Sequence, residues 1–310
     1  MTTSIQNPFY SIKLFGLNKY FVDLIKIYNS GKFPNIKLIT GKKGIGKFTL
    51  INHFMNYIYD KTYDNEINLI NLNSEFNKQY LNNVFSNIFY LGENNISNIK
   101  VDEIRNIKNT LSKSNLENKP RFFILDNIEN FNINSLNALL KILEDPGKDN
   151  YFILIHSNEK PLLETIFSRS LVSRIHINQK ESDAILTNII NEYNLDFIID
   201  KNKIKSSPGN LLRFNAVCID NSINLNDNFL KNLDKIFRLF KSEKNKVFIN
   251  LALFLSENYF NDLYFTNKDK IIKINNLKIE TLKNINEFVE YNLNQQLILS
   301  KISNNIANAS

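Results

Sequence analysis

The spacing of apolar residues divides the chain into helices and short strands. Apolar residues at positions 17–28 recur every three or four residues, which predicts a helix with one buried face. Strand-length apolar runs follow, with helical patterns between them. We expect strands at residues 36–40, 67–72, 122–125, 151–155 and 174–177. This alternation predicts a parallel sheet with helices on both of its faces.

The pattern changes after residue 178, where strand-like runs end. The clearest helices before that point are expected at 101–111 and 133–143. After it, only helical spacing is found, and we expect helices at 184–193, 229–240, 247–259 and 277–302. The chain therefore divides into a mixed α/β part at 1–178, a small helical part at 179–220 and an all-helical part at 221–310.

Composition narrows the class of protein. The chain has 310 residues, 43% of them hydrophobic and 22% charged, which is typical of a multidomain globular protein. No apolar run approaches a membrane span, and residues 1–8 do not resemble a signal peptide. The single cysteine, Cys218, fits a reducing cytoplasm. The net charge of +7 would suit nucleic acid, but the abundance of Lys, Asn and Ile is also typical of an A/T-biased genome.

A phosphate-binding loop follows the first strand. Residues 41–47 read Gly-Lys-Lys-Gly-Ile-Gly-Lys and lead into helical spacing. In this context backbone N–H groups and a helix N-terminus hold phosphates, and the lysine reaches the β and γ groups. We expect Gly41, Gly44, Gly46 and Lys47 to form this loop. The alternative is a glycine turn before a helix.

The loop lacks its metal ligand. The residue after the lysine is normally Ser or Thr, whose hydroxyl binds Mg²⁺, but this chain has Phe48. Thr49 has a hydroxyl one residue later, where a helix turns it away by about 100°. Thr49 is therefore a poor substitute.

The second half of the site is also altered. The strand expected at 122–125 ends at Asp126, which could bind a metal through water. The next residue is Asn127, at a position where ATPases with such a loop have a Glu that polarises the attacking water. Glu129 lies two residues further on, and we expect it to point elsewhere. These changes indicate a vestigial nucleotide site formed by the loop glycines, Lys47, Thr49 and Asp126, with weakly bound ATP or ADP.

Several segments resemble one family. Residues 30–47 and 137–146 (Asn-Ala-Leu-Leu-Lys-Ile-Leu-Glu-Asp-Pro) are similar to bacterial clamp-loader subunits of the AAA+ class, in particular delta-prime. Residues 101–105 (Val-Asp-Glu-Ile-Arg), 168–170 (Ser-Arg-Ser) and 207–213 (Ser-Pro-Gly-Asn-Leu-Leu-Arg) match further family segments. The similarity covers residues 8–215 well. It implies an α/β P-loop AAA+ domain, a small helical lid and an all-helical C-terminal collar.

The resemblance also implies roles and partners. Arg169 stands where the family places an arginine finger that reaches the ATP of a neighbouring subunit, with Arg174 as the rival and a helix-capping Arg as the alternative. Gly209 replaces the sensor 2 Arg. The implied partners are the gamma/tau and delta subunits in a hetero-oligomer, and through them the sliding clamp and primed DNA of DNA polymerase III. The family's four-cysteine zinc module has no counterpart here, so we expect no zinc and no other metal.

Three hypotheses of function follow. The first is an assembly subunit of a clamp loader without ATPase activity of its own. The second is an autonomous AAA+ ATPase or another P-loop nucleotide-binding protein, which Phe48 and Asn127 argue against. The third is a DNA-binding module with a decayed loop. His156, at the end of the strand expected at 151–155, is given no role, whereas Ser157 and Asn158 could line a phosphate pocket.

Overall fold

The computed structural model describes residues 7–92, 101–111, 119–200, 205–225 and 227–307. The chain packs as two compact units, Met1–Asp196 with Ser206–Leu212, and Phe197–Lys205 with Arg213–Ser310. Helix α9 (Pro208–Asp220) contributes residues to both units. The boundaries expected at residues 178 and 220 stay predictions.

The first unit is built on a five-stranded parallel sheet in the order β2-β3-β4-β1-β5. Its strands are β1 (Ile36–Thr40), β2 (Ile88–Leu91), β3 (Arg121–Leu125), β4 (Asn150–His156) and β5 (Leu171–Arg174). Strands β1 and β3 are buried along their whole length. Continuous burial is typical of parallel strands that are covered on both faces. The predicted parallel sheet is confirmed.

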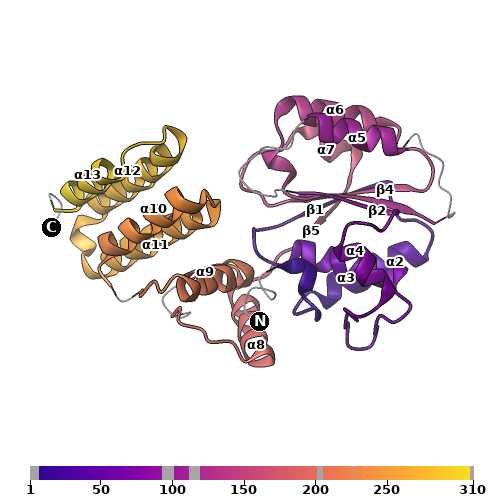
Figure 1. The fold of residues 1–310 in the computed structure, drawn as a ribbon, viewed down its shortest axis with the longest axis horizontal. Coiled ribbons are helices and arrows are strands. Elements are labelled where there is room, and N and C mark those ends of the chain that lie inside the picture. Colours follow the sequence, from indigo (N-terminus) through magenta and orange to yellow (C-terminus); the bar gives the residue numbers. More distant parts are fainter. Residues whose placement is uncertain (1–6, 93–100, 112–118, 201–204, 226, 308–310) are drawn as a thin grey trace. The chain divides into compact units, whose positions relative to one another are not determined.

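Helices cover both faces of this sheet. One face carries α2 (Asn18–Asn29), α3 (Lys47–Tyr59) and α4 (Glu75–Leu81), and the other carries α5 (Val101–Leu111), α6 (Ile133–Glu144) and α7 (Glu164–Arg169) (Figure 1). Neighbouring side chains of β1 join different cores, since Ile39 packs with the α2–α4 face and Leu38 with the α5–α7 face. This is the alternation that a strand's period of two residues requires.

The strand expected at residues 67–72 was wrong. Asn68 has a positive φ of 51° and Ile67 is exposed, so the segment forms a turn rather than a strand of the sheet. An isolated bridge between Asp64 and Leu69 closes the turn, and Leu69 also bridges to Lys13. The sheet takes its strand instead from β2, whose four apolar residues we had not predicted as a strand. The strand expected at 174–177 lies earlier in the chain, as β5, and ends at Arg174.

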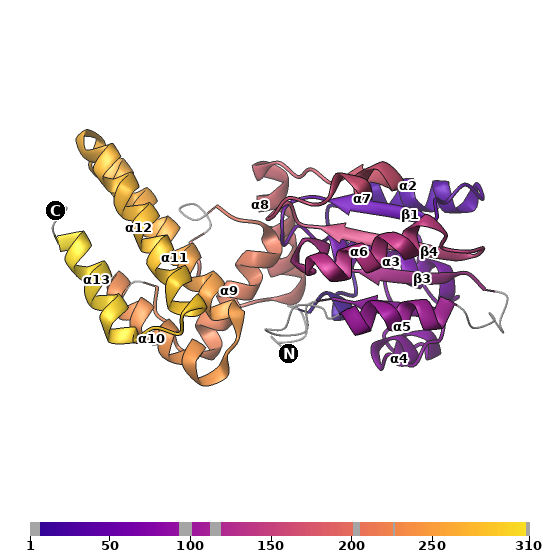
Figure 2. The same ribbon diagram turned by 90° about the horizontal axis from the view of Figure 1, so that it is seen from above.

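The helical part begins with α8 (Gln179–Tyr193), which starts at a capping box formed by Asn178 and Glu181 and packs with the first unit. In the second unit α10 (Phe229–Glu243) packs on α11 (Lys246–Thr266) and α13 (Gln295–Ala307). Helix α12 (Ile271–Glu290) lies beside α11 and also contacts α13 (Figure 2). The C-terminal all-helical region is therefore confirmed.

The single long helix expected at residues 277–302 is two helices, α12 and α13. The chain turns between them at Tyr291 and Asn292, where Asn292 adopts a positive φ of 46°. Within the described ranges, no helix combines the length and apolar character needed to cross a membrane.

Candidate functional site

The phosphate loop connects β1 to α3 at the carboxyl end of the sheet. Gly44 and Gly46 have φ values of 78° and 94°, a left-handed conformation that glycine adopts without strain. Gly46 is the N-cap of α3, and Lys47 is its first residue. A Cβ at Gly41 would lie 2.6 Å from the carbonyl oxygen of Ile175, which is too close, so this approach of the two backbones requires glycine. The structure therefore brings the predicted loop residues together between strand and helix.

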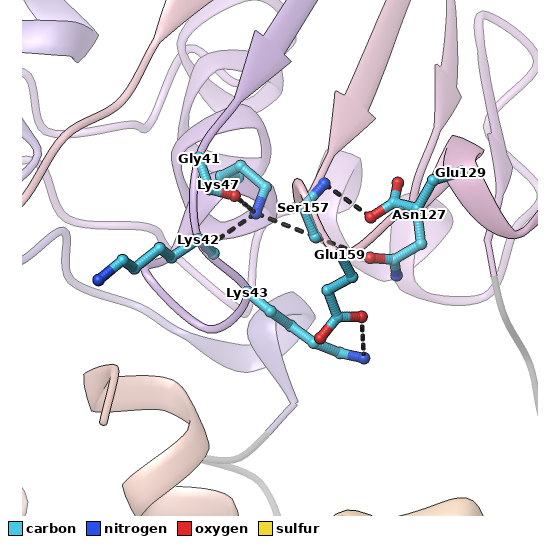
Figure 3. A network of polar contacts seen from close by, with 8 residues as sticks. All are labelled: Gly41, Lys42, Lys43, Lys47, Asn127, Glu129, Ser157 and Glu159. Carbon is cyan, nitrogen blue, oxygen red and sulfur yellow. Dashed lines mark hydrogen bonds and ion pairs between the residues drawn. The ribbon is translucent and has the colours of Figure 1, made fainter. Parts of the chain in front are cut away.

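The ammonium group of Lys47 forms hydrogen bonds with the backbone of its own loop. Its Nζ donates to the carbonyl oxygens of Gly41 at 2.8 Å and Lys42 at 2.9 Å, and to Ser157 Oγ at 3.1 Å (Figure 3). The side chain is 5% exposed, and this burial lowers the pKa of Lys47 to about 8. The ammonium group thus makes within the chain the contacts that a phosphate would otherwise receive.

Ser157 connects Lys47 to the end of β3. Its hydroxyl donates to Asn127 Oδ1 at 3.0 Å, and its backbone N–H donates to Glu129 Oε1 at 2.8 Å (Figure 3). The expectation that Glu129 points elsewhere was wrong, because this carboxylate is 93% buried in the network, its exposed fraction being 7%. Asn127 has a positive φ of 52° and leads into the short helix η2 (Ile128–Asn130), and this turn returns Glu129 to the site.

Asp126 lies at the carboxyl end of β3, where the sequence predicted it. It accepts a hydrogen bond from the Tyr90 hydroxyl at 3.3 Å. Burial raises the pKa of Asp126 to about 6, while Lys47 and the Tyr90 hydrogen bond act in the opposite direction. Phe48 is buried and its ring packs on that of Tyr90, and Thr49 follows it in α3 as a half-buried residue. Tyr90 is a site residue that the sequence analysis missed.

Two contacts hold the loop to neighbouring segments. Lys43 pairs with Glu159, after β4, at 2.9 Å. Gly209, at the start of α9, donates its backbone N–H to the Gly44 carbonyl oxygen at 2.8 Å. A Cβ at Gly209 would lie 2.7 Å from that oxygen, so the close approach depends on glycine at the position where an ATPase was expected to have an arginine.

Arg169 is the last residue of α7 and lies apart from the loop network. Its Nη2 pairs with Glu144 Oε1 at 3.1 Å, and its Nη1 donates to the Thr165 carbonyl oxygen at 3.2 Å. The side chain is 36% exposed. Arg174, the rival candidate, is the exposed last residue of β5 and pairs with Thr40 in the sheet.

The remaining candidates have simple surroundings. His156 is buried, and its Nε2 donates to the Lys160 carbonyl oxygen at 3.0 Å. Across the residues that the structure describes, no cluster of three His, Cys, Asp or Glu side chains is placed to hold a metal ion.

The fold and this loop define a P-loop protein of the AAA+ clamp-loader class. The model of the family described as "DNA polymerase III, delta subunit" matches residues 16–179, and the chain belongs to that family. The resemblance to delta-prime is thereby confirmed. Delta-prime of Buchnera aphidicola subsp. Baizongia pistaciae is 30% identical over 92 residues, which cover 30% of this chain and 27% of that protein. Delta-prime of Bacillus subtilis is 37% identical over 71 residues, or 23% of this chain and 22% of that protein.

A gamma subunit and a solved structure are also similar. The gamma subunit of Buchnera aphidicola subsp. Schizaphis graminum is 27% identical over 177 residues, which cover 54% of this chain and 46% of that protein. A gamma subunit-related protein from Thermotoga maritima aligns over 90% of this chain and 96% of its own, with 16% identity and a TM-score of 0.48. The chain thus spans about a quarter of the length of the two delta-prime relatives and about half of the gamma relative.

Proposed function

We propose that this chain is a non-hydrolysing, delta-prime-like subunit of the DNA polymerase III clamp loader. It assembles with gamma/tau and delta subunits, and the complex loads the sliding clamp on primed DNA during replication. The observation that carries the proposal is the family match over residues 16–179 together with a nucleotide loop whose lysine is bonded to the loop itself.

The side chains at three positions are unsuited to ATP hydrolysis. The Phe48 side chain has no atom that can bind a metal ion, and the Asn127 side chain is an amide that cannot take a proton from water. Asp126 is already bonded to Tyr90. ATP or ADP therefore binds weakly, because an entering phosphate must compete with the bonds that Lys47 makes to Gly41 and Lys42.

The proposed contribution to catalysis is made in trans by Arg169. A cation placed against the transferring phosphate stabilises the charge that develops there. Two observations support Arg169: it stands at the exposed end of α7, and its guanidinium group is held only by a partly exposed ion pair to Glu144 and a hydrogen bond to the Thr165 carbonyl oxygen among the contacts of the described residues. A pair of that kind contributes little free energy, so Arg169 can exchange it for a phosphate. The collar role of the second unit is proposed from its helical fold.

Reconstitution tests the proposal. We expect the purified chain to form a stable complex with the gamma/tau and delta subunits of its organism, and to hydrolyse no ATP alone. Size-exclusion chromatography with mass measurement and a steady-state ATPase assay give the two results. Failure to assemble contradicts the proposed function. Turnover by the isolated chain that is lost in Lys47→Ala would instead favour the autonomous ATPase.

A further inference from the structure

The surroundings of Asp126 do not fit the Mg²⁺ ion that a P-loop fold implies. In P-loop proteins the hydroxyl after the lysine and the acid at the end of the neighbouring strand hold that ion together. Here the first position is Phe48, which is 6% exposed. Its ring lies 4.5 Å from the ring of Phe9, in η1 (Pro8–Tyr10), and 4.9 Å from the ring of Tyr90, measured between centroids. An apolar aromatic cluster therefore stands where water and oxygen ligands would be needed.

Tyr90 contacts both halves of this altered site. Its ring packs on Phe9 at 5.0 Å as well as on Phe48, and its hydroxyl donates to Asp126 Oδ2 at 3.3 Å. Strand pairing fixes this position, because β2 lies beside β3 and Leu91 accepts a hydrogen bond from the backbone N–H of Asp126. The Tyr90 hydroxyl thus competes with any metal-bound water for a hydrogen bond to Asp126 Oδ2.

Gly92 makes room for the ring of Tyr90. A Cβ at Gly92 would lie 2.2 Å from the Tyr90 hydroxyl oxygen and 2.6 Å from Cζ. Contacts this short are impossible, so any larger residue at 92 would displace the ring. The position of Tyr90 over Asp126 therefore depends on a glycine two residues later in the chain.

We infer that Tyr90 is the residue that excludes a metal ion from the phosphate loop, so that restoring a hydroxyl at position 48 is not sufficient to rebuild the metal site. This role of Tyr90 deepens the proposed function and rests on it, since it requires the loop to be a nucleotide loop that has lost hydrolysis. A serine at 48 supplies one ligand, but Asp126 remains bonded to Tyr90. Removing the Tyr90 hydroxyl as well as the Phe48 ring frees the acid, while the serine supplies the hydroxyl at position 48.

The test compares full-length variants for Mg²⁺-dependent binding of ATP. Titration calorimetry with MgCl₂ and with EDTA gives the two affinities, and the electron paramagnetic resonance signal of free Mn²⁺ reports metal binding directly. We expect Mg²⁺ to change the ATP affinity of Phe48→Ser by less than about threefold, and that of Phe48→Ser/Tyr90→Phe by roughly tenfold or more.

Tyr80 provides a matched control. It belongs to the same cluster, with its ring 5.8 Å from that of Phe9, and its buried hydroxyl has no hydrogen-bond partner among the described residues. Phe48→Ser/Tyr80→Phe should therefore behave as Phe48→Ser does. Phe48→Ser/Gly92→Ala should follow the Tyr90 variant, because the added methyl group displaces the ring.

Three outcomes overturn the inference: full Mg²⁺ dependence in Phe48→Ser alone, none in Phe48→Ser/Tyr90→Phe, or an equal gain in the Tyr80 control. If loss of the Phe48 ring prevents folding, as judged by circular dichroism, Tyr90→Phe alone decides the question, since it removes one hydroxyl. It must bind more Mn²⁺ in the presence of ATP than Tyr80→Phe does, and equal binding refutes the inference. Assembly of the same variants with gamma/tau and delta tests the proposed function separately.

Discussion

Replacing Arg169 with alanine separates a catalytic role in trans from a structural one. The structural contribution of Arg169 is small, because its ion pair with Glu144 joins side chains that are 36% and 58% exposed. Pairs this exposed contribute less than about 1 kcal/mol to the free energy of unfolding. We therefore expect Arg169→Ala to fold, and to assemble with gamma/tau and delta as the unaltered chain does.

The expected effect on catalysis is much larger. Arginine fingers are worth roughly 10³–10⁵ in the rate of phosphoryl transfer at the site they serve. The deficit measured for the whole complex will be smaller, because only the ATP site that faces this subunit loses its finger. The assay is ATPase of the reconstituted loader, stimulated by the clamp and primed DNA, with complex stoichiometry measured alongside.

Glu144→Gln is the matched control. It removes the same ion pair but leaves the guanidinium group in place, so it should cost the same small stability and leave turnover at least at the level of the unaltered complex. Arg169→Ala complexes with unaltered turnover and clamp loading would refute the role of Arg169. Arg174→Ala then tests the exposed arginine at the end of β5.

Three further predictions concern the chain itself. The isolated chain should hydrolyse ATP at background rate, and turnover above buffer controls that disappears in Lys47→Ala would contradict this. Deleting residues 222–310 should abolish assembly, measured by chromatography, while circular dichroism and limited proteolysis show a folded P-loop unit; a truncated chain that still enters the complex argues against a collar. Asp126→Asn should raise the free energy of unfolding at neutral pH by about 3 kcal/mol, since burial raises the pKa of Asp126 from 3.8 to about 6. A raised pKa means that the folded chain holds the proton more tightly, so the stability this group contributes is present at low pH and lost as the pH rises through about 6. The gain in the free energy of unfolding of Asp126→Asn should vanish below about pH 4. Urea unfolding that shows the same gain at neutral pH and below about pH 4 would disprove this account.

Much of the fold could be predicted from the sequence because the signals are local. The phosphate loop is a continuous run in which strand, glycines, Lys47 and helix follow one another. Helical spacing likewise identified α2, α5 and α6, since residues three and four apart share a face. The absence of a metal ligand at Phe48 and of an acid at Asn127 could be predicted from the sequence for the same reason. Each position is defined by its immediate neighbours, Lys47 and Asp126.

The tertiary structure alone decided how the altered site is filled. Tyr90 reaches Asp126 because β2 pairs with β3, and a four-residue apolar run does not reveal its place in a sheet. Glu129 returns to the site because Asn127 adopts a left-handed conformation that its sequence does not require. Gly209 meets Gly44 from far along the chain. The sequence by itself thus determined which groups the phosphate loop and the end of the neighbouring strand lack: a hydroxyl at position 48 and an acid at position 127. Which of the chain's own side chains replaced them depended on contacts between distant segments, and these contacts are set by the packing of the whole unit.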